Sequence, residues 1–255
     1  RCLQVEVTTF SGGDRLIFFK DVTEQYKLEV MRRDFIGNVS HEMRTPLTVL
    51  KGYVQTIQSL DAHIVAPIER PLAQMDMQVV RMEMLLKDLL WLSRIESIEN
   101  SDKTTPVDMC DLTTELVGDL RAAWPERDIL LVHEFDGLVL GDPMELHSAA
   151  SNLIVNALKY SDEEFEVLVE WTLQEGQPVL SVIDKGEGID PVHIPRLTER
   201  FYRVDKSRSQ KTGGTGLGLA IVKHVALAHN AELRIQSELG EGSRFSLIFN
   251  TNDVA

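Results

Sequence analysis

Val39-Ser40-His41-Glu42-Met43-Arg44-Thr45-Pro46-Leu47 places one histidine among polar neighbours inside a helical pattern. A serine precedes His41 and a carboxylate follows it, whereas a histidine of a protein core is usually packed among apolar residues. Glu42 is suited to orient the imidazole and to accept its second proton. Pro46 removes a backbone N–H and should bend the helix beside the histidine. The run therefore predicts an exposed and oriented nucleophile.

Helical periodicity extends from this run in both directions. Apolar residues recur at spacings of three and four over about 24–59, and again over about 69–98 after a break at Asp61–Pro67. Two such helices joined by a short loop form an antiparallel hairpin. One hairpin leaves much of its apolar stripe uncovered, so we expect a homodimer in which two hairpins form a four-helix bundle.

The predicted helical domain covers 24–100 and consists of a linker helix followed by the helical hairpin. Different patterns flank it on both sides. Residues 1–23 have the alternation of two strands around a Ser11–Asp14 turn. Because an isolated hairpin is marginal in water, we expect it to be the end of a larger domain, and the chain to be a fragment of a longer protein. The polar stretch Glu99–Pro106 reads as a linker before a second domain at 106–250.

Helices and strands alternate within this second domain, which indicates an α/β sandwich, a mixed sheet covered by helices. The predicted helices are 111–124, 142–159 and 217–229, and the predicted strands are 129–135, 138–140, 165–173, 178–184, 232–237 and 244–249. The predicted fold class is thus α+β, a dimerising helical hairpin followed by an α/β sandwich.

Composition restricts the possible functions. A net charge of −14 argues against direct nucleic-acid binding, which needs a basic patch. Two cysteines make no disulfide framework and indicate a reducing compartment. No apolar run reaches the roughly 18 to 20 residues that span a bilayer. We therefore expect this piece of the protein to be soluble.

Three polar clusters of the second domain have residue types that suit a nucleotide. On a predicted helix, Asn152 and Asn156 are four residues apart and share a face. An amide oxygen at Asn156 suits Mg²⁺, which binds few protein groups and takes substrate phosphates as well. Lys159 adds positive charge, and Tyr160 offers a surface for a purine. By itself, such a helix is equally typical of a solvated face.

The second cluster, Asp184-Lys185-Gly186-Glu187-Gly188, directly follows a strand. A carboxylate at a strand end can accept a hydrogen bond from an exocyclic amine. Gly186 and Gly188 allow the backbone to turn and to approach a ligand closely. Taken alone, the cluster would be read as a tight turn.

The third cluster is a glycine-rich loop before a helix, where backbone N–H groups make an anion site. It contains Gly214, Thr215, Gly216, Leu217 and Gly218. It is neither a Walker A loop nor a Gly-x-Gly-x-x-Gly fingerprint. The residues between the second and third clusters, including a basic run from Lys206 to Lys211, read as a mobile cover over a ligand.

In this order, the clusters resemble the sequence boxes of bacterial sensor histidine kinases. His41 lies where that family has its H box, Asn152–Tyr160 its N box, Asp184–Gly188 its first G box, Glu199–Tyr202 its F box and Gly214–Gly218 its second G box. The run His193–Lys206 resembles the members that act in phosphate starvation. Residues 1–23 resemble the tail of the PAS domain that precedes the kinase core in those members.

The resemblance implies that His41 takes the γ-phosphoryl group of Mg-ATP and passes it to an aspartate of a PhoB-like response regulator. It implies that Asp184 reads adenine, that Asn156 holds Mg²⁺ and that the Gly214–Gly218 backbone cradles the phosphates. Members with Glu-x-x-Thr after the histidine also dephosphorylate their regulator, so Thr45 is the candidate for positioning water. The parent protein is expected to be anchored in the inner membrane, with this portion in the cytoplasm.

Two other functions compete with this one. An ATPase of the gyrase or chaperone type has a similar nucleotide pocket but needs a glutamate base on the N-box helix, for which Glu145 is the candidate. It leaves His41 unexplained. A dimeric adaptor with a degenerate kinase domain would require broken boxes, and every box is complete. The six other histidines lack an acidic-Thr-Pro context and are predicted to be structural or exposed.

Overall fold

The structure is a computed structural model that describes residues 3–9, 15–23, 39, 42–55, 57, 69–96, 105–161, 164–204 and 214–250. It divides into two compact units, residues 1–82 and 83–255, and each is considered by itself. His41 and the predicted helix break at Asp61–Pro67 lie outside the described residues, as does the basic run from Lys206 to Lys211.

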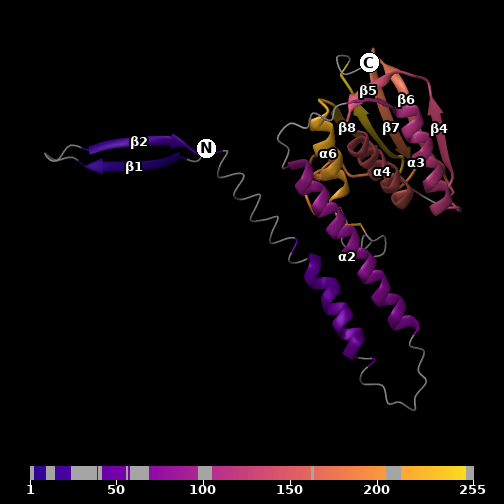
Figure 1. Ribbon diagram of the computed structural model, residues 1–255, viewed down its shortest axis with the longest axis horizontal. Coiled ribbons are helices and arrows are strands. Elements are labelled where there is room, and N and C mark those ends of the chain that lie inside the picture. Colours follow the sequence, from indigo (N-terminus) through magenta and orange to yellow (C-terminus); the bar gives the residue numbers. More distant parts are fainter. Residues whose placement is uncertain are drawn as a thin grey trace. The chain divides into compact units, whose positions relative to one another are not determined.

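The first unit begins with the predicted hairpin. Strands β1 (Leu3–Thr9) and β2 (Arg15–Asp21) pair antiparallel, from Leu3 opposite Asp21 to Thr9 opposite Arg15 (Figure 1). The two strands predicted within residues 1–23 are confirmed. The large apolar side chains whose burial the structure describes here are exposed, 67% for Phe19.

The described residues of the first unit beyond Thr23 are helical and include sequence neighbours of His41. Residues 42–55 are helical, and α2 (Glu69–Glu96) starts where the periodicity predicts. Pro46 is buried. The Thr48 hydroxyl donates to the Arg44 carbonyl oxygen at 2.9 Å, a back-bond that favours bending at this point.

Along α2, part of the predicted apolar stripe is uncovered in the single chain. Leu72, Val79 and Leu86 recur every seven residues and are 53%, 40% and 52% exposed. A seven-residue repeat of apolar side chains is the spacing that pairs helices in bundles. The stripe thus has the pattern of a surface that a second helix covers.

The second unit is built on a five-stranded mixed sheet in the order β4-β6-β7-β9-β8. The strands are β4 (Ile129–His133), β6 (Val167–Gln174), β7 (Gln177–Asp184), β8 (Glu232–Glu238) and β9 (Gly242–Ile248). Strand β4 runs parallel to β6, and the other pairs are antiparallel. The predicted mixed sheet is confirmed.

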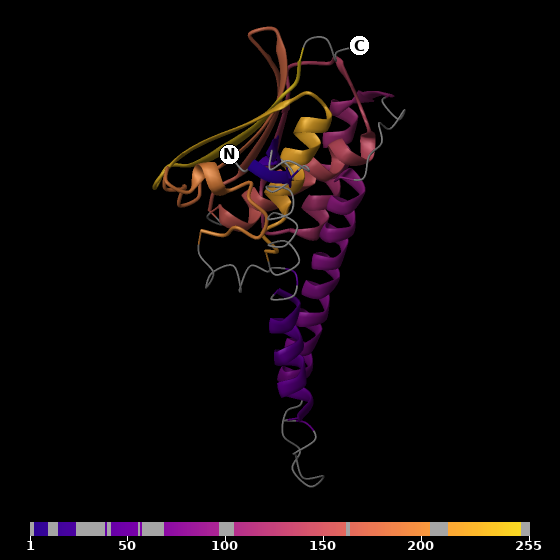
Figure 2. The ribbon, with the colours of Figure 1, turned by 90° about the vertical axis from the view of Figure 1, so that its left-hand side faces the viewer.

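Three helices cover one face of this sheet: α3 (Met109–Ala123), α4 (Pro143–Tyr160) and α6 (Gly218–Ala228) (Figures 1 and 2). Fully buried apolar side chains fill the space between the two layers, among them Trp171 and Leu180 of the sheet and Ile154 and Ile221 of the helices. Burial of this kind is the main stabilising term of the domain. The sandwich is therefore the predicted one.

One strand was not predicted. Strand β3 (Thr105–Asp108) pairs antiparallel with β5 (Leu138–Gly141), although Thr105 and Pro106 were placed in the linker. Proline at a strand edge, after a polar run, hides the strand signal. Asp108 then caps α3, because its carboxylate accepts N–H bonds from Cys110 and Asp111.

A buried histidine joins the end of α6 to the start of α4. His229 Nε2 accepts the N–H of Asp142 at 3.0 Å, and Nδ1 lies 2.8 Å from the carbonyl oxygen of Val225. With Nε2 accepting, the proton sits on Nδ1, so the ring bridges two backbone groups as a neutral tautomer. His229 is thus structural, as predicted for the histidines outside the H box.

Replacing His229 with alanine should destabilise the protein by about 2–3 kcal/mol, because the buried N–H of Asp142 loses its acceptor. The measurement is the urea midpoint of the second unit's unfolding, followed by tryptophan fluorescence. His147→Ala, an exposed histidine on α4, is the matched control and should leave the midpoint unchanged. Equal midpoints for both variants would contradict the bridging role.

Candidate functional site

Helix α4 presents the two predicted asparagines one turn apart. The Asn152 amide nitrogen donates to the Ser148 carbonyl oxygen at 2.9 Å, which orients its oxygen. That oxygen faces the first turn of α6, 2.6 Å from where a Cβ on Gly218 would lie. Asn156 is half-buried on the same side of the helix. The glycine-rich loop and the N-box helix thus meet at Asn152.

Asp184 is buried at the end of β7, 5% exposed. Its Oδ1 accepts the N–H of Gly186 at 2.9 Å. Burial raises the pKa of this carboxyl, and backbone N–H bonds from Gly186 and Ser243 oppose the rise. A buried carboxylate oriented by backbone donors is suited to read one hydrogen-bond donor of a ligand.

The turn after Asp184 packs directly on the end of α4. Ser161 and Gly186 form a β-bridge, and a Cβ on Gly186 would lie 2.1 Å from the carbonyl oxygen of Tyr160. Only glycine allows this close approach of two backbones. The structure therefore brings Asp184 next to the helix end that carries Lys159 and Tyr160.

The F box and the second G box are clasped together. The N–H of Phe201 donates to the Gly216 carbonyl oxygen at 2.8 Å. Both residues have positive φ, 63° and 73°, and a Cβ on Gly216 would lie 2.9 Å from the Phe201 Cα. A non-glycine residue with such a φ is uncommon and marks a constrained turn. This clasp holds the chain on both sides of residues 205–213.

Two cations, Lys159 and Arg203, lie near the loop. Burial lowers the pKa of Lys159, nearby Asp88 opposes the change, and the like charge of Arg203 adds to it. Arg203 also lies alongside the loop, its side chain 3.3 Å from the Cβ position of Gly216. Arg203 was not predicted as a site residue, and the only sequence signal for it is its place directly after the F box. The cluster favours an anion such as a phosphate.

The residues around His41 belong to the first unit. Glu42 Oε2 pairs with the Arg81 guanidinium at 3.1 Å, which ties the helical residues 42–55 to α2. Thr45 is half-buried three residues further on. Arg81 was not predicted as a partner of Glu42, because no local pattern links residues 39 positions apart. The roles of Glu42 and Thr45 stay predictions.

Glu145, the base that the ATPase alternative requires, lies at the other end of α4. Its carboxylate is 3.8 Å from His229 Nδ1, beside the α4 cap. Eleven residues of helix separate it from Asn156, roughly 16 Å along the axis. That position does not suit a base acting on a ligand beside Asn156.

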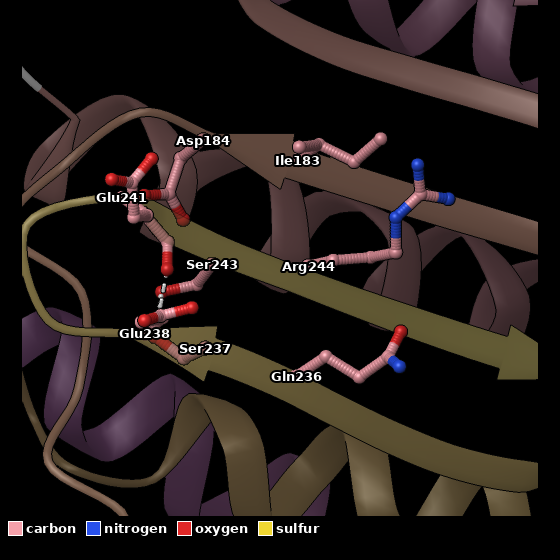
Figure 3. A pocket seen from close by; sticks show the side chains of 9 residues that line it. Ile183, Asp184, Gln236, Ser237, Glu238, Glu241, Ser243 and Arg244 are labelled. Carbon is pink, nitrogen blue, oxygen red and sulfur yellow. Dashed lines mark hydrogen bonds between the residues drawn. The ribbon is translucent and has the colours of Figure 1, made fainter.

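Figure 3 shows a hollow on the opposite face of the sheet. Ile183, Arg244 and Gln236 lie side by side across β7, β9 and β8, with Glu241 at the strand ends. Ile183 and Asp184 alternate along β7, so their side chains point to opposite faces. The hollow therefore lies outside the space between the sheet and the helices, where the N box and G boxes converge.

The described residues contain no group of three His, Cys, Asp or Glu side chains that could hold a metal by themselves. One amide oxygen at Asn156, with Asn152 a turn away, suits an ion that arrives with its own phosphate ligands. Mg²⁺ binds in this manner, through few protein groups and substrate oxygens. The donor set fits Mg²⁺ bound together with a nucleotide.

Two known protein domains match the parts of this chain that contain the candidate site residues. Residues 31–98 match the His Kinase A (phospho-acceptor) domain, and residues 141–253 match the histidine kinase-, DNA gyrase B- and HSP90-like ATPase domain. The first match contains His41, and the second contains all the residues assigned to the N box and G boxes. The chain belongs to the sensor histidine kinases, and ATP binding follows from its second domain.

Among curated relatives, the chain is 44% identical over 255 residues to the phosphate regulon sensor protein PhoR of Pseudomonas aeruginosa, and 39% identical over 257 residues to PhoR of Haemophilus influenzae. These alignments cover 99% and 97% of this chain, but 58% of each relative. The chain thus spans little more than half the length of the proteins it matches.

Solved structures show the same fold. Acinetobacter baumannii histidine kinase AdeS aligns over 83% of this chain and 98% of its own, with a TM-score of 0.66 at 22% identity. The mycobacterial sensor histidine kinase MprB aligns over 57% of this chain and 96% of its own, with a TM-score of 0.51 at 28% identity. Among the described residues, no helix is both long and apolar enough to cross a bilayer.

Proposed function

We propose that this chain is the kinase core of a sensor protein, in which ATP held by the second unit phosphorylates His41. The observation that carries the proposal is the convergence of Asn152, Asp184, Gly186 and the Gly214–Gly218 loop at one end of α4. Asp184 would accept the exocyclic amine of adenine. Lys159, Arg203 and the loop backbone would hold the phosphates.

The chemical step is an in-line phosphoryl transfer. A neutral imidazole nitrogen of His41 attacks the γ-phosphorus, the bond to the β–γ bridging oxygen breaks, and ADP leaves. Glu42 directly follows His41 in the sequence and would take the proton that the imidazole releases. Its carboxylate also pairs with Arg81. Mg²⁺ bound at Asn156 with the nucleotide would screen the phosphate charge.

The similarity to PhoR proteins supports further proposals about the full-length protein. The phosphoryl group would pass to an aspartate of a PhoB-like response regulator in a phosphate-starvation response. The exposed α2 stripe of Leu72, Val79 and Leu86 supports a homodimer joined through the helical hairpins. The full-length protein would be anchored in a membrane, and residues 1–23 would end a PAS domain.

The fate of the γ-phosphate separates this function from an ATPase of the gyrase or chaperone type. The chain is incubated with Mg²⁺ and γ-labelled ATP, and label on the protein is compared with label released as phosphate. If the chain is a kinase, acid-labile label on the protein should approach one per subunit before much phosphate is released. Phosphate release over many turnovers without label on the protein would support the ATPase.

Thr45 provides a separate test of the second activity. Replacing Thr45 with alanine should lower dephosphorylation of the phosphorylated regulator at least about tenfold, because the hydroxyl that positions the attacking water is lost. Autophosphorylation should stay within about twofold, since Thr45 does not carry the transferred group. Thr48→Ala, one turn further along the same helix, is the control. Full phosphatase activity in Thr45→Ala would show that this assignment is wrong.

A further inference from the structure

The second unit contains an acidic side chain inside the candidate phosphate site. Asp88 belongs to the part of α2 that clusters with the sheet domain. Its Oδ2 accepts a hydrogen bond of 2.7 Å from the hydroxyl of Thr215. Thr215 is the central polar residue of the Gly214–Gly218 loop. The contact therefore joins a helix outside the sandwich to the loop that would cradle phosphates.

The hydroxyl of Thr215 also organises the loop itself. It accepts the N–H of Leu217 at 3.2 Å while it donates to Asp88. Leu217 N–H is one of the backbone donors at the start of α6, where an anion would bind. Through Thr215, the carboxylate of Asp88 is thus coupled to the donor that a phosphate would use.

Charge places Asp88 in the same cluster. Asp88 and Lys159 attract each other, since each moves the pKa of the other toward the charged form. Burial raises the pKa of Asp88, and Thr215, Lys159 and Lys87 oppose that rise. The like charge of Arg203 acts on Lys159, so the cation that attracts Asp88 belongs to a pair of cations. The Asp88 carboxylate thus has the partners, Lys159 and Thr215, that a bound phosphate group would have.

Asp88 differs from an ordinary acidic residue on a helix surface. Such residues pair with lysines one turn away and contribute little. Asp88 instead contacts a loop 127 residues distant, between the buried Leu85 and Leu92. Glu83, on the same helix, is exposed and represents the ordinary case.

We propose that Asp88 occupies the phosphate site of the nucleotide-free protein as an internal competitor, and that ATP must displace it from Thr215. The proposal rests on the proposed function, because it assigns the phosphates of ATP to this loop. It makes the position of α2 a control on nucleotide affinity. A movement of α2 that withdraws Asp88 would raise the affinity for ATP, and one that holds it in place would keep the kinase inactive.

The test compares ATP with adenosine, which lacks the phosphates. Binding of each is measured by calorimetry, with Mg²⁺ present, in the complete chain carrying His41→Gln so that bound ATP is not consumed. Asp88→Ala should bind ATP about tenfold more tightly, the scale of one charge-assisted hydrogen bond. Asp88→Asn, which keeps the shape but loses the charge, should gain several-fold. Adenosine affinity should stay within about twofold in both variants.

Glu83→Gln, on the same helix, is the control for a general change of charge and should leave both affinities unchanged. ATP affinity that is unchanged or lower in both Asp88 variants would overturn the proposal. An equal gain for adenosine would overturn it as well, because the carboxylate would then not compete with phosphates. If Asp88→Ala fails to fold, Asp88→Asn decides alone. Adenosine and ATP both failing to bind every chain would instead refute the proposed function.

Discussion

His41→Gln should abolish labelling of the protein by γ-labelled ATP, a loss of at least about 10³-fold, while leaving ATP affinity within about twofold. Glutamine removes the nucleophilic nitrogen, and a covalent mechanism has no substitute for its nucleophile. Nucleotide affinity should be retained because every residue assigned to ATP lies in the second unit. The two measurements are radiolabel per subunit and calorimetric binding of ATP.

His147→Gln is the matched control for this prediction, since His147 is an exposed histidine on α4. It should keep full labelling. Persistent label in His41→Gln would mean that another residue accepts the phosphoryl group. A parallel loss of ATP binding would mean that His41 supports the fold or the nucleotide site rather than the transfer.

Asp184→Asn should weaken ATP binding at least about hundredfold without loss of fold. The N–H of Gly186 already donates to one oxygen of this side chain, so the amide oxygen of asparagine would take that position. Its NH₂ group would then face the exocyclic amine of adenine, donor against donor. A buried polar mismatch of this kind has a large cost. Calorimetry with ATP is the measurement.

The stability of Asp184→Asn follows from the sign of the pKa shift. Burial raises the pKa of Asp184 above its ordinary 3.8, although Gly186 and Ser243 oppose the rise. A raised folded pKa means that the carboxyl's stabilising contribution is complete below the unfolded pKa and is lost as pH rises through the folded one. At pH 7 the ionised group is therefore a net cost, and the asparagine variant should melt no lower than the wild type.

Asp190→Asn is the control for this pair of measurements. Asp190 is exposed in the same loop region and accepts the N–H of Val192. It should change neither ATP affinity nor melting temperature. Unaltered ATP binding in Asp184→Asn would remove adenine recognition from this residue, and a large drop in melting temperature would show that its main role is structural.

Sequence alone predicted the elements whose pattern is local. The helix α2 is readable from the period of its apolar residues, and the first six residues of β6 are readable because buried residues alternate along most of them. Strand β7 is readable as a short apolar run that is buried on both faces. The glycines also carried a signal, since Gly186 and Gly216 stand where two backbones meet. Strand β3 was missed because Pro106 and its polar neighbours lack that alternation.

The contacts that set the site's electrostatics were not predictable in this manner. Glu42 and Arg81 are 39 residues apart, and Asp88 and Thr215 are 127 apart. No period links such residues, and Glu42, Arg81 and Asp88 each have the sequence character of an ordinary helix surface. Arg203 was likewise visible only through its place directly after the F box. Three-dimensional packing decided which charges meet.

If ATP bound by the second unit transfers its γ-phosphoryl group to His41, the phosphoryl group should be found on that histidine. Mass-spectrometric localisation of the phosphoryl group tests it most directly, in the wild-type chain incubated with ATP and Mg²⁺ and digested under alkaline conditions that preserve phosphohistidine. We expect the modification on the peptide that contains His41. Modification of a different residue, or an unmodified His41 in a chain that consumes ATP, would contradict it.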